Sequence, residues 1–163
     1  MKRARWMHVA LLVFAGLGIS ADAQQVIYIV RHGEKLDDSK DPPLSAAGEA
    51  RAARLERMLA ASGVKAIYTS QYQRTIQHAA PVARALKIAP VVHPAGDTPG
   101  LVKKIVAHGA DDVVLVVGHA NTVPEILKSL GHSNPVKIEE AEFDNLFVLV
   151  RGTQTPVVAH LKY

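Results

Sequence analysis

The sequence contains no cysteine among its 163 residues. This absence excludes disulfide bonds, cysteine nucleophiles, zinc sites built from thiolates, and lipid attachment at a cysteine. Charged residues are also few, at 21%, whereas hydrophobic residues make up 48% of the chain. A chain of this length and composition is expected to form one globular domain that is stabilised by its apolar core.

The chain also lacks an apolar run long enough to cross a bilayer, which takes about 20 residues. The stretch Val9–Ile19 has only eleven residues and follows three basic residues among the first five. It is followed by Ala21-Asp22-Ala23, which places small residues at the two positions that a signal peptidase reads. We therefore predict a signal peptide over residues 1–23, cleavage after Ala23, and a secreted or periplasmic domain over residues 24–163. An uncleaved membrane anchor is the alternative.

There is little excess charge of either sign. Loss of residues 1–23 leaves 16 basic and 14 acidic residues in the remaining chain. Such a balance gives little support for binding to nucleic acid or to an acidic membrane surface. After cleavage we expect no stable insertion into a membrane, and we expect the partner to be a small molecule.

Short β-branched runs alternate with stretches that have helical periodicity. This alternation predicts an α/β fold: a three-layer sandwich with a mostly parallel central sheet, helices on both faces and a C-terminal antiparallel hairpin. The expected strands are Val26–Val30, Ala66–Thr69, Pro90–His93 and Val113–Val117, with a closing hairpin of Leu146–Val150 and Pro156–Leu161 around Gly152. The expected helices are Ser45–Ser62, Gln71–Leu86, Pro99–His108 and Val123–Leu130.

Four polar residues follow the predicted parallel strands. Arg31 and His32 come directly after the first strand, Arg74 lies shortly after the second, and His119 comes just after the most apolar strand. Because ligands bind at the carboxyl ends of the strands in such sheets, we expect these side chains to meet in one pocket.

These residue types suit chemistry on a phosphate. Two guanidiniums can bind a phosphate dianion through several donors, and a neutral imidazole is a nucleophile near pH 7. A second imidazole can donate a hydrogen bond to a phosphoryl oxygen in the transition state. Gly33 and Gly118 allow the backbone to approach closely beside each histidine. This chemistry requires no metal ion and no other cofactor.

Four segments carry a resemblance to a known family. They are Val30-Arg31-His32-Gly33-Glu34, Leu44-Ser45-x-x-Gly48, Thr69-Ser70-x-x-x-Arg74-Thr75 and Val117-Gly118-His119. Together they resemble the histidine phosphatase superfamily, in its phosphoglycerate-mutase-like branch, and the run 117–124 resembles exported members. The resemblance implies metal-independent hydrolysis of a phosphomonoester through a phosphohistidine on His32. It also implies that Arg31 and Arg74 hold the phosphate and that His119 is the second pocket histidine.

The sequence departs from the family at the expected proton donor. That branch usually carries a glutamate after the third strand, whereas residues 93–98 here contain none. Asp97 is the only carboxylate in this segment, so we predict that it protonates the leaving oxygen. The chain also has His78 where many relatives carry threonine, and Ala120 where the exported members often have serine. The short segment after the third strand leaves little chain for a cap, which favours a phosphatase over a mutase.

Other readings of the same residues remain open. The chain could be a non-catalytic anion-binding module or a protein phosphohistidine phosphatase, and His32, His119 and Asp97 could instead bind a metal. Lys35 and Asn121 flank the motifs and are candidate substrate contacts. We expect His78 to pack in the interior. The remaining expectations concern surface residues: His93, His108, His132 and His160 in surface or loop positions, and Arg51, Arg54 and Arg57 on a solvated helix face.

Overall fold

The computed structural model describes residues 24–152 and 154–163. The predicted signal peptide of residues 1–23 lies outside the described residues. The strands are β1 (Gln25–Arg31), β2 (Val64–Thr69), β3 (Val91–Val92), β4 (Val113–Gly118), β5 (Asn145–Arg151) and β6 (Val157–Lys162). The helices are α1 (Ala46–Leu59), α2 (Gln73–Leu86), α3 (Thr98–Val106) and α4 (Thr122–Ser129). In the described part of the chain, none of these helices is long and apolar enough to span a bilayer.

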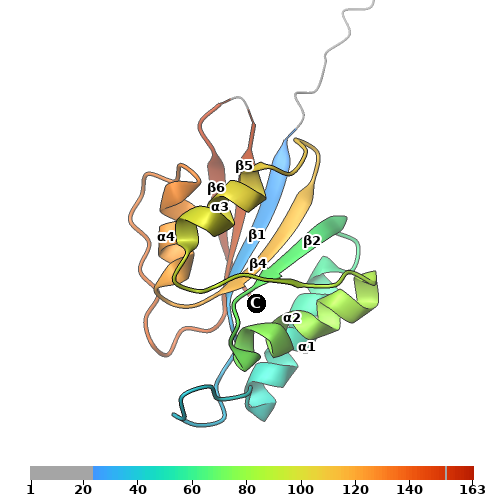
Figure 1. The fold of residues 1–163 in the computed structure, drawn as a ribbon, viewed down its shortest axis with the longest axis vertical. Coiled ribbons are helices and arrows are strands. Elements are labelled where there is room, and N and C mark those ends of the chain that lie inside the picture. The colour runs from blue at the N-terminus through green and yellow to red at the C-terminus, as the bar shows by residue number, and fades with distance from the viewer. Residues whose placement is uncertain (1–23, 153) are drawn as a thin grey trace, which may run out of the picture.

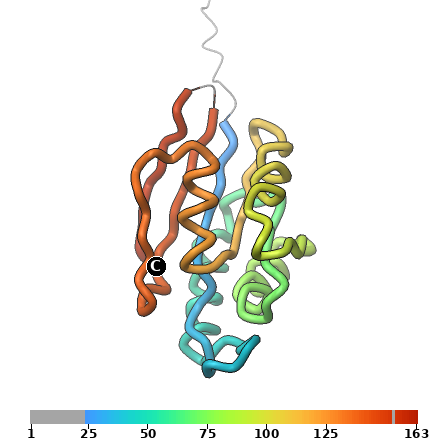
Figure 2. The backbone as a smooth tube through the Cα atoms, turned by 60° about the vertical axis from the view of Figure 1, so that its left-hand side comes forward, coloured from blue at the N-terminus to red at the C-terminus, as the bar shows by residue number. Residues whose placement is uncertain are grey.

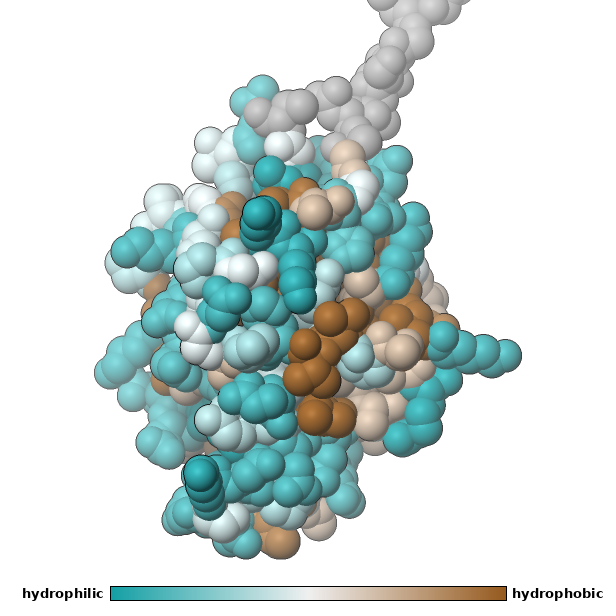
Figure 3. Space-filling view, viewed as in Figure 1, coloured by the Kyte–Doolittle hydropathy of each residue, from teal (hydrophilic) through white to brown (hydrophobic). Residues whose placement is uncertain are grey.

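The strands form one sheet in the order β3-β2-β4-β1-β5-β6 (Figure 1). β1, β2, β3 and β4 are parallel, while β5 runs antiparallel to β1 and pairs with β6 as a hairpin. The predicted α/β fold with a mostly parallel sheet and a closing antiparallel hairpin is confirmed. The third strand is only two residues long. Val91 and Val92 on this edge strand are exposed. Figure 3 shows one patch of brown, hydrophobic atoms near the middle of a face that is otherwise mostly hydrophilic.

Helices cover both faces of the sheet, as predicted. α1 and α2 pack on one face, over a core that includes Leu55, Ile67 and Leu115. α3 and α4 pack on the other face, over a core that includes Ile29, Ile105 and Ile126. In β1 and β4, neighbouring residues therefore point into different cores, which explains why both strands are apolar without interruption.

The helix starts follow local chemistry. The side chain of Ser45 accepts a hydrogen bond from the backbone N–H of Gly48, so it caps α1. α2 continues through Pro81 without a break. Met58, near the end of α1, is 46% exposed although it is hydrophobic.

Arg51 of α1 was predicted on a solvated helix face, and the structure shows that this prediction is wrong. Arg51 lies partly buried and forms an ion pair with Glu34, with 3.0 Å between Arg51 Nε and Glu34 Oε2. Its Nη1 also donates to the main-chain oxygen of Tyr163 at 2.9 Å. The helical periodicity grouped Arg51 with Arg54 on one helix face. It could not show that the folded chain brings Glu34 next to Arg51.

Candidate active site

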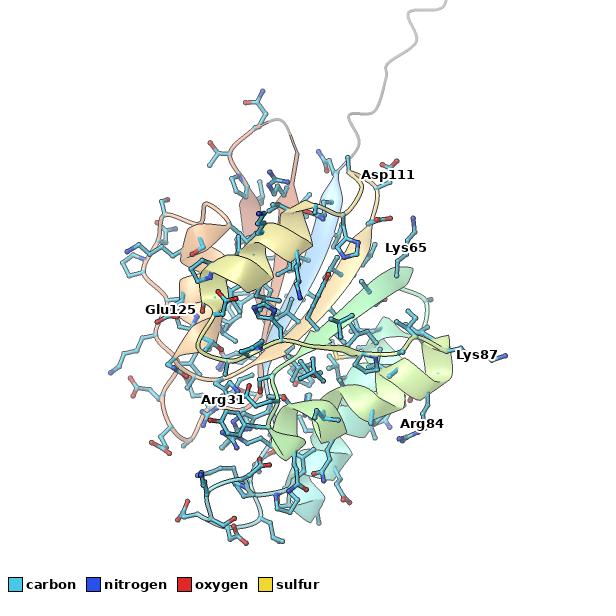
Figure 4. All side chains as sticks on the ribbon, viewed as in Figure 1. Arg31, Lys65, Arg84, Lys87, Asp111 and Glu125 are labelled. Carbon is cyan, nitrogen blue, oxygen red and sulfur yellow. The ribbon has the colours of Figure 1, made fainter. Side chains whose placement is uncertain are left out.

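The sheet register brings the four predicted residues to one edge. Arg31 pairs with Gly118 across β1 and β4, and Thr69 pairs with Val117 across β2 and β4. His32, Ser70 and His119 therefore follow directly from three adjacent strand ends, and Arg74 comes from the first turn of α2. The two arginines and two histidines line one pocket with a cavity volume of about 420 Å³. Figure 4 shows Arg31 at this end of the sheet.

The hydrogen bonds of His32 define its tautomer. Its Nδ1 lies 2.7 Å from the carbonyl oxygen of Gly33. A carbonyl can only accept, so Nδ1 carries the proton and Nε2 keeps a lone pair. The Nε–H of Arg74 donates to that Nε2 at 3.2 Å, in agreement with this assignment. Burial lowers the pKa of His32 to about 3, and the positive charges of the nearby arginines add to this effect. The imidazole is therefore neutral at pH 7.

Arg31 is held by the loop that precedes β5. Its Nη1 donates to the main-chain oxygens of Glu139, Glu140 and Glu142 at 2.8, 2.9 and 3.0 Å. Its guanidinium lies 4.0 Å from the centre of the Phe143 ring. Its Nε is buried and has no hydrogen-bond partner among the described residues. The loop thus fixes one side of the guanidinium and leaves other donors for a ligand.

Arg74 is oriented in a similar way from the opposite side. Its guanidinium lies 4.4 Å from the centre of the Tyr72 ring. Its Nη1 is buried without a hydrogen-bond partner in the described part of the chain, at 3.6 Å from a carboxylate oxygen of Asp41. Each arginine therefore stacks on an aromatic ring that restricts its motion, which leaves less conformational entropy to lose when an anion binds.

His119 lies next to His32, with 5.2 Å between the ring centres. Its Nε2 is 2.8 Å from the Oγ of Ser70, and its backbone N–H donates to Thr122 Oγ1 at 2.9 Å. Burial, together with the positive charges of Arg74 and Arg31, lowers the pKa of His119 to about 4. Gly118 is required here, because a Cβ would lie 2.8 Å from Thr122 Oγ1.

Both residues predicted to flank the substrate line this pocket. Lys35 forms an ion pair with the exposed Asp38 at 2.9 Å. Asn121 precedes α4, and its side chain makes no capping hydrogen bond. Both groups lie where a ligand could reach them, and contact with substrate stays a prediction.

Asp97 does not line the pocket with His32. Its side chain caps α3 by accepting from the N–H of Gly100 at 2.9 Å, and its Oδ2 lies 3.2 Å from Nε2 of His93. The structure thus gives the predicted proton donor a different set of contacts. Asp97 is therefore not grouped with His32 and His119, the other two residues of the alternative metal site. Over residues 24–152 and 154–163, no three side chains of histidine, aspartate or glutamate are grouped to hold a metal.

For two other histidines, the prediction from sequence was wrong (His93) or incomplete (His78). His93, predicted at the surface, is buried, and its Nε2–H donates to the main-chain oxygen of Asp97, 2.8 Å away. His78 is fully buried, as predicted, but it also contacts the site's backbone. Its Nδ1 accepts from the N–H of Gly33 at 3.0 Å, and its Nε2 lies 2.9 Å from the hydroxyl of Tyr163.

Sequence reasoning missed Tyr72, Glu140 and Phe143. Tyr72 lies inside the Ser70-x-x-x-Arg74 segment, so its position next to Arg74 could have been inferred. Glu140 and Phe143 belong to residues 131–144, which contain no regular helix or strand. Figure 2 shows this segment in orange, descending beside the red strands toward the site. Without a periodic pattern, the sequence carried no signal that it would fold onto Arg31.

The comparisons with known proteins agree with this geometry. A family model described as the histidine phosphatase superfamily, branch 1, matches residues 27–95. No curated protein matches the sequence. The protein histidine phosphatase SixA, solved with tungstate, superposes with a TM-score of 0.69 at 16% identity, covering 84% of this chain and 96% of its own.

Two mycobacterial structures are also similar. A glucosyl-3-phosphoglycerate phosphatase has a TM-score of 0.63 at 14% identity, covering 78% of this chain and 90% of its own. A protein described as a mycobacterial hydrolase has a TM-score of 0.66 at 14% identity, covering 86% of this chain and 98% of its own. These likenesses establish the fold. The match to the histidine phosphatase superfamily model covers residues 27–95, which include Arg31, His32 and Arg74 but not His119.

Proposed function

We propose that this protein is a phosphatase that hydrolyses a phosphomonoester through a phosphohistidine on His32. One observation carries the proposal. The Nε2 of His32 is unprotonated, because Nδ1 donates its proton to the Gly33 carbonyl, and it accepts a hydrogen bond from Arg74 Nε–H. A neutral, oriented imidazole beside two guanidiniums is suited to attack a bound phosphate.

Each residue of the site has a separate role in the first displacement at phosphorus. Arg31 and Arg74 bind the phosphate dianion, and Arg74 Nε–H moves from the imidazole to a phosphoryl oxygen. His32 Nε2 then attacks phosphorus while the ester bond breaks. The Gly33 carbonyl stabilises the positive charge that develops at Nδ1–H. His119 donates to a phosphoryl oxygen as the charge redistributes. Water subsequently releases phosphate and regenerates the neutral imidazole.

Several observations support a small substrate. The pocket volume of about 420 Å³ falls in the usual range for small-molecule sites, roughly 300–1,000 Å³. The similar mycobacterial phosphatase acts, by its name, on glucosyl-3-phosphoglycerate. We further propose that the protein acts outside the cytoplasm and without a metal, because of the signal-like N-terminus and the two guanidiniums.

A substrate panel on the chain 24–163 tests this proposal. We expect turnover of p-nitrophenyl phosphate, and His32→Ala should lower kcat by several orders of magnitude. His132→Ala, which lies in a separate surface groove, serves as the matched control. Phosphate binding without turnover of any phosphomonoester would favour the anion-binding module. Turnover confined to a phosphohistidine peptide would favour a protein phosphohistidine phosphatase.

A further inference from the structure

The phosphatase mechanism needs a proton donor, and the three carboxylates that the sequence placed near the motifs have other contacts. Asp97 caps α3, and Glu34 pairs with Arg51. Glu125 accepts a hydrogen bond from Thr98 Oγ1 at 3.0 Å and lines a different groove. Figure 4 shows Glu125 beside α3, away from Arg31. None of the three lines the pocket that contains His32.

One acidic residue does line this pocket. Among the lining residues in the described part of the chain, Glu140 is the only one with a carboxylate. Its main-chain oxygen accepts from Arg31 Nη1 at 2.9 Å, so its backbone is fixed to one of the phosphate-binding residues. Its carboxylate makes no hydrogen bond or ion pair with the described residues, and the side chain is exposed. The group is thus positioned at the site and free to contact a substrate.

The neighbouring glutamates of the same loop are engaged elsewhere. Glu139 pairs with Lys137, at 2.5 Å between Nζ and Oε1. Glu142 accepts from the backbone N–H of Glu139 at 3.0 Å and lies 3.4 Å from Lys162 Nζ. Of the three glutamates in this loop, Glu140 is the one that lines the pocket and whose carboxylate has no partner among the described residues.

The electrostatics of Arg31 support this placement. Burial lowers the pKa of Arg31, and the charge of Glu140 is the largest influence that opposes the decrease, ahead of Glu34. The carboxylate therefore lies near the guanidinium without a direct ion pair between them.

We propose that Glu140 is the general acid and base of the reaction. This inference rests on the proposed phosphatase function. In the first step, the Glu140 carboxyl gives its proton to the leaving oxygen as the P–O bond breaks and the bond from phosphorus to His32 Nε2 forms. In the second step, the carboxylate takes a proton from water as the water oxygen attacks phosphorus. The N–P bond then breaks, its electron pair returns to Nε2, and phosphate leaves.

Esters with different leaving groups distinguish a proton donor from a residue that acts only through its charge. An alkoxide must be protonated as it leaves, whereas p-nitrophenolate needs little help. We compare Glu140→Gln with Glu139→Gln, which makes the same change in charge one residue away. For each, rapid quenching measures the rate of phosphoenzyme formation from glycerol phosphate and from p-nitrophenyl phosphate, and the rate of its breakdown.

The expected result is selective. Glu140→Gln should slow phosphoenzyme formation from glycerol phosphate by about 10²–10⁴-fold. Phosphoenzyme formation from p-nitrophenyl phosphate should be nearly unchanged. Hydrolysis of the phosphoenzyme should be slowed. Glu139→Gln should behave as wild type. Equal slowing of formation from both esters would indicate only an electrostatic effect on Arg31 and would overturn the inference. A selective effect of Asp97→Asn instead would also overturn it.

Failure of the inference can be told from failure of the proposed function. If the wild-type protein forms a phosphoenzyme and Glu140→Gln matches Glu139→Gln, only the role of Glu140 is wrong. If the wild-type protein forms no phosphoenzyme and turns over neither ester, the proposed function itself is wrong.

Discussion

The Nδ1 of His78 accepts a hydrogen bond at 3.0 Å from the backbone N–H of Gly33, the residue next to the proposed nucleophile. The carbonyl of the same glycine accepts from His32 Nδ1 at 2.7 Å. Because Nδ1 of His78 is an acceptor, its proton lies on Nε2, which therefore donates to the Tyr163 hydroxyl at 2.9 Å. A continuous line of hydrogen bonds thus connects Tyr163, which follows β6, through His78 of α2 to the backbone that orients His32.

This connection predicts different effects for two substitutions of His78. His78→Leu leaves the Gly33 N–H buried without an acceptor, which should cost about 1–3 kcal/mol of the free energy of unfolding. It should also lower kcat more than it raises KM, since the carbonyl that orients His32 belongs to the same residue. His78→Asn keeps an acceptor near the Nδ1 position and should recover most of kcat. Urea denaturation and steady-state kinetics measure both effects. If Asn and Leu lower kcat equally, or neither lowers it, His78 has only a packing role.

The buried histidines predict the direction of the pH dependence of stability. Burial lowers the pKa of His78 and of His119 to about 4, and that of His32 to about 3, each from an ordinary value of 6.5. Below pH 6.5 the unfolded chain therefore binds protons that the folded chain does not bind. The free energy of unfolding should decrease as the pH falls from 6.5 toward 4, by up to about 1.4 kcal/mol per pH unit for each histidine. Urea denaturation in phosphate-free buffer at pH 7, 6 and 5 checks this, and constant stability over that range would contradict it.

Activity should survive removal of metal ions. Arg31 and Arg74 each keep a buried donor atom without a partner in the described part of the chain, so they can neutralise a bound phosphate themselves. We expect the same kcat on p-nitrophenyl phosphate before and after treatment with EDTA. A loss that zinc or magnesium restores would argue for a metal-assisted mechanism.

The mature protein should begin at Gln24. Gln24 is exposed, and the buried Gln25 is the first residue of β1, so cleavage after Ala23 leaves the whole strand in the sheet. N-terminal sequencing of the protein from the periplasm or the medium tests this. Recovery of an intact, membrane-bound form that begins at Met1 would refute cleavage.

The sequence predicted the parts of the site that follow from regular structure. Arg31, His32 and His119 each follow an apolar strand, and the register of parallel strands is enough to bring such residues together. It did not predict Glu140 or Phe143, because they lie in residues 131–144, where no periodic pattern marks how the chain folds. Asp97 was assigned by analogy of position after the third strand. Physically, an aspartate just before Thr98-Pro99 is also a strong signal for the start of a helix, and that is how the chain uses it.

The identity of the phosphorylated residue tests the account most directly. The protein is mixed with a labelled phosphoester, quenched within milliseconds in base, digested and mapped. We predict one labelled peptide, with the phosphate on His32, stable to base and labile to acid as a phosphoramidate is. His32→Ala should show no label and lose turnover by several orders of magnitude. Label on any other residue, or turnover by His32→Ala near the wild-type rate, would contradict the mechanism.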